Sequence, residues 1–69
     1  MSDNPTRLEA GHNHVLAYCR ACPPWRELRW DQPEALDAAA THVQLVHGNM
    51  TLAEKLRERA AEQTRHARR

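Results

Sequence analysis

The feature that most constrains the fold of this chain is its shortage of large apolar side chains. Its 69 residues include no Phe and no Ile, and alanine supplies much of the 41% that is hydrophobic. A chain of this length forms one small domain, whose core rarely contributes more than ~3–5 kcal/mol to folding. We therefore expect a disulfide, a bound metal or a partner chain to complete the stability of the fold.

Two cysteines and two histidines have the spacing of a metal site. Cys19 and Cys22 are separated by two residues, so that one tight turn can present both sulfurs to the same ion. His42 and His47 are separated by four residues, near the end of a predicted helix. Zinc binds four nitrogen or sulfur ligands in a tetrahedron, which these two pairs supply. The sequence therefore predicts one structural zinc ion held by Cys19, Cys22, His42 and His47.

Two other arrangements of these residues stay open. Cys19 and Cys22 can form a disulfide, although the chain shows neither a signal-peptide core nor a transmembrane run, and thiols stay reduced in the cytoplasm that we expect to contain it. His12 and His14 can compete with a helix histidine as ligands. The zinc prediction favours His42 and His47 because both fall on the apolar face of the predicted helix.

Strand signals flank the cysteine pair. Residues 1–13 are polar and lack a clear period, which predicts a flexible segment. Residues 14–18 form a short apolar-rich run, and residues 25–30 alternate, with Trp25 and Glu27 on one face and Leu28 and Trp30 on the other. We expect these two runs to pair as a hairpin.

Helix signals follow in the second half. Asp31 with Glu34 three residues later resembles a capping box, and the helix is expected to run over 35–47 and to stop at Gly48. A second capping box, Thr51 with Glu54, predicts a helix from 51 to about 67. Its Glu residues alternate with Lys and Arg, as on a solvated face.

Residues 14–48 resemble the two-Cys two-His zinc-finger family, which has a ββα fold. The resemblance rests on the ligand order, on the strand–turn–strand–helix order and on Tyr18 directly before Cys19. It implies that Cys19, Cys22, His42 and His47 are zinc ligands. The expected fold is a small zinc-stabilised α+β domain: a β-hairpin plus helix over 14–50, preceded by the flexible segment 1–13 and followed by a charged helix and basic tail over 51–69.

The chain departs from the family pattern at three places. Nineteen residues separate Cys22 from His42, against about 12–15 in the usual finger. Arg26 stands where the family has a core aromatic, and Ala39 stands where it has a leucine, so that Leu36 would have to fill that space. These differences predict a longer second strand and an extra helical turn.

The predicted zinc ligands and the distribution of charged residues limit the classes of function that the sequence predicts. Four ligands leave zinc no open position for water, which predicts a protein without enzymatic activity. The outward positions of the finger helix carry acidic residues and no basic one, so nucleic acid would contact other segments. The predicted contacts are arginines of the hairpin and of the C-terminal third: Arg20, Arg26, Arg29, Arg57, Arg59, Arg65, Arg68 and Arg69.

The sequence therefore predicts a zinc-binding regulatory protein that associates with nucleic acid. The alternative is a protein–protein adaptor or inhibitor that uses the finger helix and the tryptophan hairpin. The net charge of only +1 indicates no strong attraction of the whole molecule to nucleic acid or membrane. No membrane association is expected, and the oligomeric state stays open.

Overall fold

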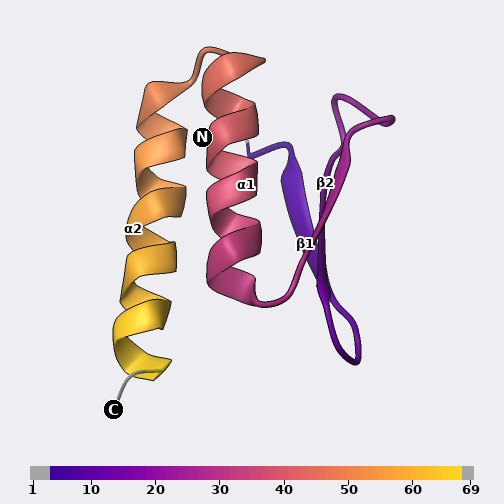
Figure 1. The fold of residues 1–69 in the computed structure, drawn as a ribbon. Coiled ribbons are helices and arrows are strands. Elements are labelled where there is room, and N and C mark those ends of the chain that lie inside the picture. Colours follow the sequence, from indigo (N-terminus) through magenta and orange to yellow (C-terminus); the bar gives the residue numbers. More distant parts are fainter. Residues whose placement is uncertain (1–3, 68–69) are drawn as a thin grey trace.

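The computed structural model describes residues 4–67, with side chains through Arg65. Three strands are followed by two helices: β1 (Thr6–Ala10), β2 (Val15–Cys19), β3 (Arg26–Arg29), α1 (Gln32–Leu45) and α2 (Met50–Ala67). Helix α1 is the middle layer, with α2 against one side and the sheet against the other (Figure 1). The prediction of a small α+β domain is confirmed, but a three-stranded sheet with two helices does not establish the ββα finger arrangement.

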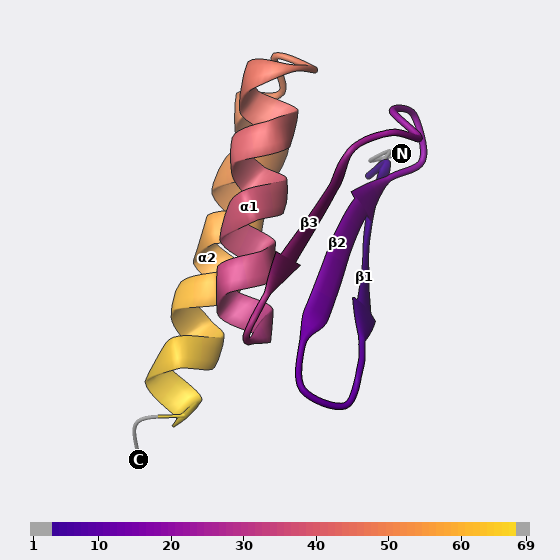
Figure 2. The same ribbon diagram turned by 45° about the vertical axis from the view of Figure 1, so that its right-hand side comes forward.

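The sheet is antiparallel in the order β1-β2-β3, so that β2 lies in the centre (Figure 2). Side chains alternate along β2: Val15, Ala17 and Cys19 are buried, whereas Leu16 and Tyr18 are only partly covered. Because the period of a strand is two residues, the buried set faces α1 and the other set lies on the outer face of the sheet. This alternation delivers Cys19 to the interface with α1.

Strand β1 lies inside the segment that the sequence predicted to be flexible. Thr6 is buried and Leu8 packs against the core, while Arg7 and Glu9 are exposed. The backbone of β1 forms its hydrogen bonds by pairing with β2, from Thr6 opposite Cys19 to Ala10 opposite Val15. Only two inward side chains mark this strand, too few for a visible period, and its partner strand lies beyond a turn.

The start of α1 confirms the predicted cap, whereas its end differs by two residues. The backbone N–H of Glu34 donates to the Asp31 side chain over 3.0 Å. The helix ends at Leu45, and the N–H of Asn49 then donates to the carbonyl of Val43 over 3.0 Å. This closure needs a left-handed residue, and Gly48 supplies it with φ +64°. His47 therefore lies in the closing turn, past the last helical residue.

Helix α2 begins at Met50 and is capped by Asn49. The side chain of Asn49 accepts a hydrogen bond from the N–H of Leu52 over 3.0 Å, and its carbonyl accepts from Ala53. The predicted cap at Thr51 was wrong, because the turn at Gly48 places Asn49 at the N-cap position of α2. The two candidates lie two residues apart and both are residues that cap well.

Apolar residues form two clusters on either side of α1. The larger one joins α1 to α2 and consists of Leu36, Ala39, Ala40, Val43, Leu52, Ala53, Leu56 and Ala60. The smaller one joins α1 to the sheet and has three buried members, Val15, Ala17 and Ala35, with Leu8 and Trp25 packed beside them. The sheet is therefore attached to α1 by little apolar surface.

Candidate metal centre

The four predicted ligands come together at one end of the interface between the sheet and α1. Cys19 is the last residue of β2, and Cys22 lies in the turn after it, where the N–H groups of Cys22 and Trp25 close on the carbonyls of Cys19 and Cys22. His42 lies in the last turn of α1, and His47 lies just beyond the helix. One ligand atom from each residue lies within 4.8 Å of the other three.

The distances in the cluster fit a tetrahedral ion. Bonds of 2.0–2.3 Å to zinc place neighbouring ligand atoms roughly 3.3–3.8 Å apart. His47 Nε2 lies 3.5 Å from Cys19 Sγ and 3.8 Å from Cys22 Sγ. Both cysteines are free thiols, so their sulfurs are available for coordination. The four residues lie close enough to bind a metal ion.

The burial of His42 gives an independent reason to place an ion here. Its side chain is 5% exposed, and its Nε2 is buried without a hydrogen-bond partner among the residues that the structure describes. An unpaired polar atom in the interior is costly, and coordination to a metal would satisfy this nitrogen. The ring is held in place by Trp25, which stacks on it with centroids 4.1 Å apart and planes at 24°.

The protonation states of His42 and Cys22 determine how the cluster would bind a cation. Burial and the nearby His47 lower the pKa of His42, so that the ring prefers the neutral form, which can coordinate a metal. Partial burial and the neighbouring Cys19 raise the pKa of the Cys22 thiol. A cation between the two sulfurs would reverse this shift, because a coordinating thiol is deprotonated. Metal binding at this site is therefore expected to release thiol protons.

The competing histidines lie elsewhere. Residues 11–14 form the turn between β1 and β2, closed by a hydrogen bond from the N–H of Gly11 to the carbonyl of His14. This turn is at the opposite end of the sheet from the cysteines (Figure 2). His12 and His14 are both exposed there, and neither belongs to the cluster.

The predicted arginine contacts do not form a single surface. Arg20 follows β2 and Arg26 begins β3, and both are exposed. Arg29 faces the other side of the sheet and pairs with Glu27 over 3.1 Å. On α2, Arg57 lies 3.8 Å from Asp37 of α1, and Arg59 and Arg65 are exposed on the same helix. Arg68 and Arg69 lie outside the described residues.

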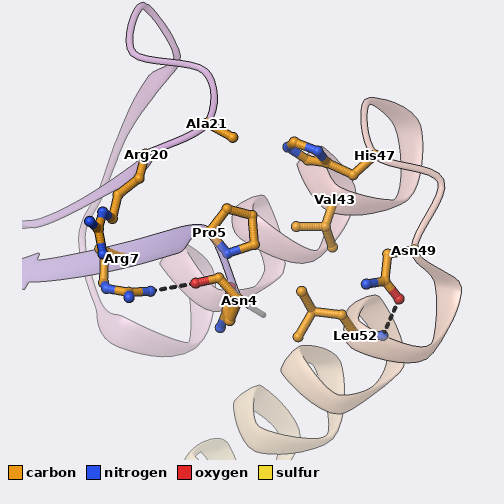
Figure 3. A pocket seen from close by; sticks show the side chains of 9 residues that line it. All are labelled: Asn4, Pro5, Arg7, Arg20, Ala21, Val43, His47, Asn49 and Leu52. Atoms are coloured by element: carbon orange, nitrogen blue, oxygen red, sulfur yellow. Dashed lines mark hydrogen bonds between the residues drawn. The ribbon is translucent and has the colours of Figure 1, made fainter. Parts of the chain in front are cut away.

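Arg7 was not among the arginines predicted from the sequence, yet it lies with Arg20 beside the cluster of cysteines and histidines. A recess of about 620 Å³ opens there, and Figure 3 shows Arg7 and Arg20 on one side and His47 and Asn49 on the other. The guanidinium of Arg7 donates to the carbonyls of Asn4 and Thr6. Recognition of β1 as a strand would have placed Arg7 directly opposite Tyr18 and thus on the outer face.

Comparison with models of known protein families found no match, and comparisons with curated proteins and with solved structures found none either. No family is therefore confirmed for this chain, including the zinc-finger family that its ligand spacing resembles. Within residues 4–67, no helix has the length and apolar character needed to cross a membrane.

Proposed function

We propose that the chain is a non-enzymatic domain whose fold is held by one structural zinc ion. The observation that carries this proposal is the convergence of two sulfurs and two imidazoles within 4.8 Å. Two thiolates and two imidazoles suit zinc, and a full set of four protein ligands leaves no position for a substrate or an activated water.

The ion would join the two elements that share the least apolar surface. Two of its ligands belong to the end of β2 and the following turn, one belongs to the last turn of α1, and one lies just beyond that helix. The cluster between the sheet and α1 has only three buried apolar members. Zinc would therefore supply the attachment that burial alone does not.

We further propose that the domain associates with nucleic acid through its outer sheet face. The strand register places Arg7 and Arg26 on either side of Tyr18, and Arg20 lines a recess with Tyr18 and Arg26. Among residues 4–65, none of these three arginines forms an ion pair with a carboxylate. Glu9 is the acidic residue that the register places on this face. Guanidinium groups without a carboxylate partner at one surface are the chemistry that phosphates bind.

The zinc proposal is tested by counting metal in single-histidine variants. His42→Ala and His47→Ala should purify with much less than one zinc per chain, whereas His12→Ala and His14→Ala should keep one. Native mass spectrometry gives the stoichiometry. A wild-type chain that is folded and metal-free after zinc supplementation would overturn the proposal.

The nucleic-acid proposal is tested by the salt dependence of oligonucleotide binding. Arg7, Arg20 and Arg26 are changed together to Gln. Each lost phosphate contact removes about 0.7 from the log–log salt slope on single strands and about 0.9 on duplex DNA, so the slope should fall by up to ~2–3. The matched control removes three arginines of α2: Arg57, Arg59 and Arg65. An equal loss in the control would show that position on the outer face does not matter.

A further inference from the structure

The outer face of the sheet carries two aromatic side chains as well as its arginines. Tyr18 lies on the central strand and opposes Arg7 on one side and Arg26 on the other. Trp30 directly follows β3 and is 81% exposed. The other tryptophan differs, because Trp25 is half-buried against His42. Burial in the core therefore accounts for Trp25 but leaves Trp30 unexplained.

Each of the two aromatics borders a recess. Tyr18 lines one of about 540 Å³ together with Arg20, Pro23 and Arg26. Trp30 lines another of about 390 Å³ with His14 and Leu28. Leu28 pairs with Leu16 across the sheet, so the outer face borders the second recess as well, and Arg29 borders it from the other face. The outer face thus borders two hollows, each with an aromatic ring in its wall.

The two aromatic residues lie at different levels along the sheet, Tyr18 on β2 and Trp30 just past the end of β3. Tyr18 opposes Arg26, and Trp30 stands four residues further along the chain from Arg26. At about 3.3 Å per residue, an extended backbone from Arg26 to Trp30 spans roughly 13 Å along the strand direction. The exposed Leu28 lies between them on the same face, and the arginines gather at the Tyr18 end.

We propose that this face binds single-stranded nucleic acid, with one base stacked on Tyr18, a second on Trp30, and the phosphates near Tyr18 held by Arg7, Arg20 and Arg26. This inference rests on the proposed nucleic-acid association and adds the class of ligand. Aromatic rings stack well on unpaired bases, and a basic groove with such rings is how proteins bind single strands. In a duplex the base faces are already stacked on each other, so that these rings would gain nothing there.

The opposite side of the sheet suits a different ligand. A groove between β3 and α1 is bordered by Glu27, Glu34 and Asp37, with the exposed apolar residues Leu45 and Val46 at one end. Its carboxylates would repel phosphate. Nucleic acid is therefore assigned to the outer face, and binding of a protein segment in the groove is the competing outcome.

The test measures fluorescence anisotropy of labelled oligo(dT) and oligo(rU) of about 12 nucleotides, within the site sizes of small single-strand binders. Duplexes containing the same strands serve as the comparison. Wild-type protein should bind the single strands more tightly. Trp30→Ala and Tyr18→Ala should each weaken single-strand binding by about 10-fold or more and change duplex binding little. The relative affinity for the dT and rU strands separates DNA from RNA as the source.

Matched variants separate stacking from folding. Trp30→Phe and Tyr18→Phe keep an aromatic ring and should bind within about 3-fold of wild type. Leu45→Ala removes an exposed apolar side chain of α1, away from this face, and should have no more effect than that. Zinc content and circular dichroism verify that each variant is folded. Because Trp30 is exposed, Trp30→Ala should stay folded and keep the test valid even if Tyr18→Ala unfolds.

The remaining outcomes distinguish the association with nucleic acid from the stacking of bases on Tyr18 and Trp30. If the arginine variant of the outer face loses binding while the alanine variants of Tyr18 and Trp30 do not, the association with nucleic acid stands and the stacking inference is overturned. Equal affinity for single strands and duplex would overturn it as well. If no oligonucleotide binds at ~100 mM salt, both proposals fail, and the groove between β3 and α1 becomes the surface to examine.

Discussion

Helix α1 is held on its two sides by different physical means. The interface between α1 and α2 buries eight apolar side chains from the two helices, among them Leu36, Leu52 and Leu56. The interface between α1 and the sheet buries three small ones, and the rest of that interface is occupied by the stacked Trp25 and the Cys–His cluster. The first interface is the ordinary packing of two antiparallel helices. The second lacks the area for such packing and gathers metal ligands instead.

The difference shows how a chain without Phe or Ile can fold at this size. Burial stabilises in proportion to apolar area, about 25 cal/mol per Å², so that alanine-rich surfaces contribute little each. Structural zinc contributes an apparent ~10–16 kcal/mol in finger peptides. A single ion can therefore replace the large side chains that the interface between the sheet and α1 lacks. Loss of the metal and loss of apolar packing should therefore affect different interfaces of α1.

Removal of the metal should have the largest effect. Chelation, or Cys19→Ser, should abolish amide exchange protection across β1, β2 and β3, because the sheet then keeps only its small apolar cluster. Any protection that survives should be confined to α1 and α2. Hydrogen exchange followed by mass spectrometry measures this directly. A metal-free chain that retains sheet protection would show that apolar burial alone holds the sheet against α1.

Truncation in the helical interface should have a smaller effect and leave the metal bound. Leu56 is 4% exposed between the helices, and Leu56→Ala should destabilise the protein by ~2–5 kcal/mol through lost burial and a cavity. Native mass spectrometry should still find one zinc per chain. The control is Leu45→Ala, which truncates a leucine of α1 that is 76% exposed and should change stability by no more than ~0.5 kcal/mol. Denaturation at fixed free zinc compares the two, and equal effects would contradict the assigned core.

Removal of the ring that holds His42 should weaken the metal site without removing a ligand. Trp25→Ala leaves His42 free to rotate, and zinc affinity should fall by about 10-fold or more, comparable to the loss of other groups that orient a ligand. Trp30→Ala, five residues away and on the other face of the sheet, should leave zinc affinity unchanged. Competition with a zinc chelator gives both affinities. Equal zinc affinities in the two variants would mean that the stacking does not position the ligand.

The convergence of the four candidate ligands could be predicted from the sequence because it depends on two short segments. Cys19 and Cys22 need one turn, and His42 and His47 need the end of one helix, so that spacing alone proposes their convergence. The register of the helix was less reliable, since His47 lies past its end and not on its face. The turn closed at Gly48 still directs His47 toward the sulfurs.

The sheet could be predicted only in part because its edge depends on a partner distant in the sequence. Strand β1 is marked by Thr6 and Leu8 alone, and its hydrogen bonds exist only once β2 lies beside it. Arg7 was missed for the same reason. Its position opposite Tyr18 is a property of the register, which no pattern within residues 1–13 could reveal.

The smallest predicted effect concerns the turn that joins the two helices. Asn49→Ala should destabilise the protein by ~1 kcal/mol, because it removes the side-chain oxygen that accepts from the N–H of Leu52. Asn49→Asp keeps that oxygen and should restore most of the loss. Thr51→Ala should change stability by no more than ~0.5 kcal/mol, since Thr51 already lies inside the helix and is exposed. Thermal unfolding of the three variants at equal zinc concentration ranks them. If Thr51→Ala proved the more damaging, the capping box expected from the sequence would be the true start of α2, and Asn49 would belong to the turn alone.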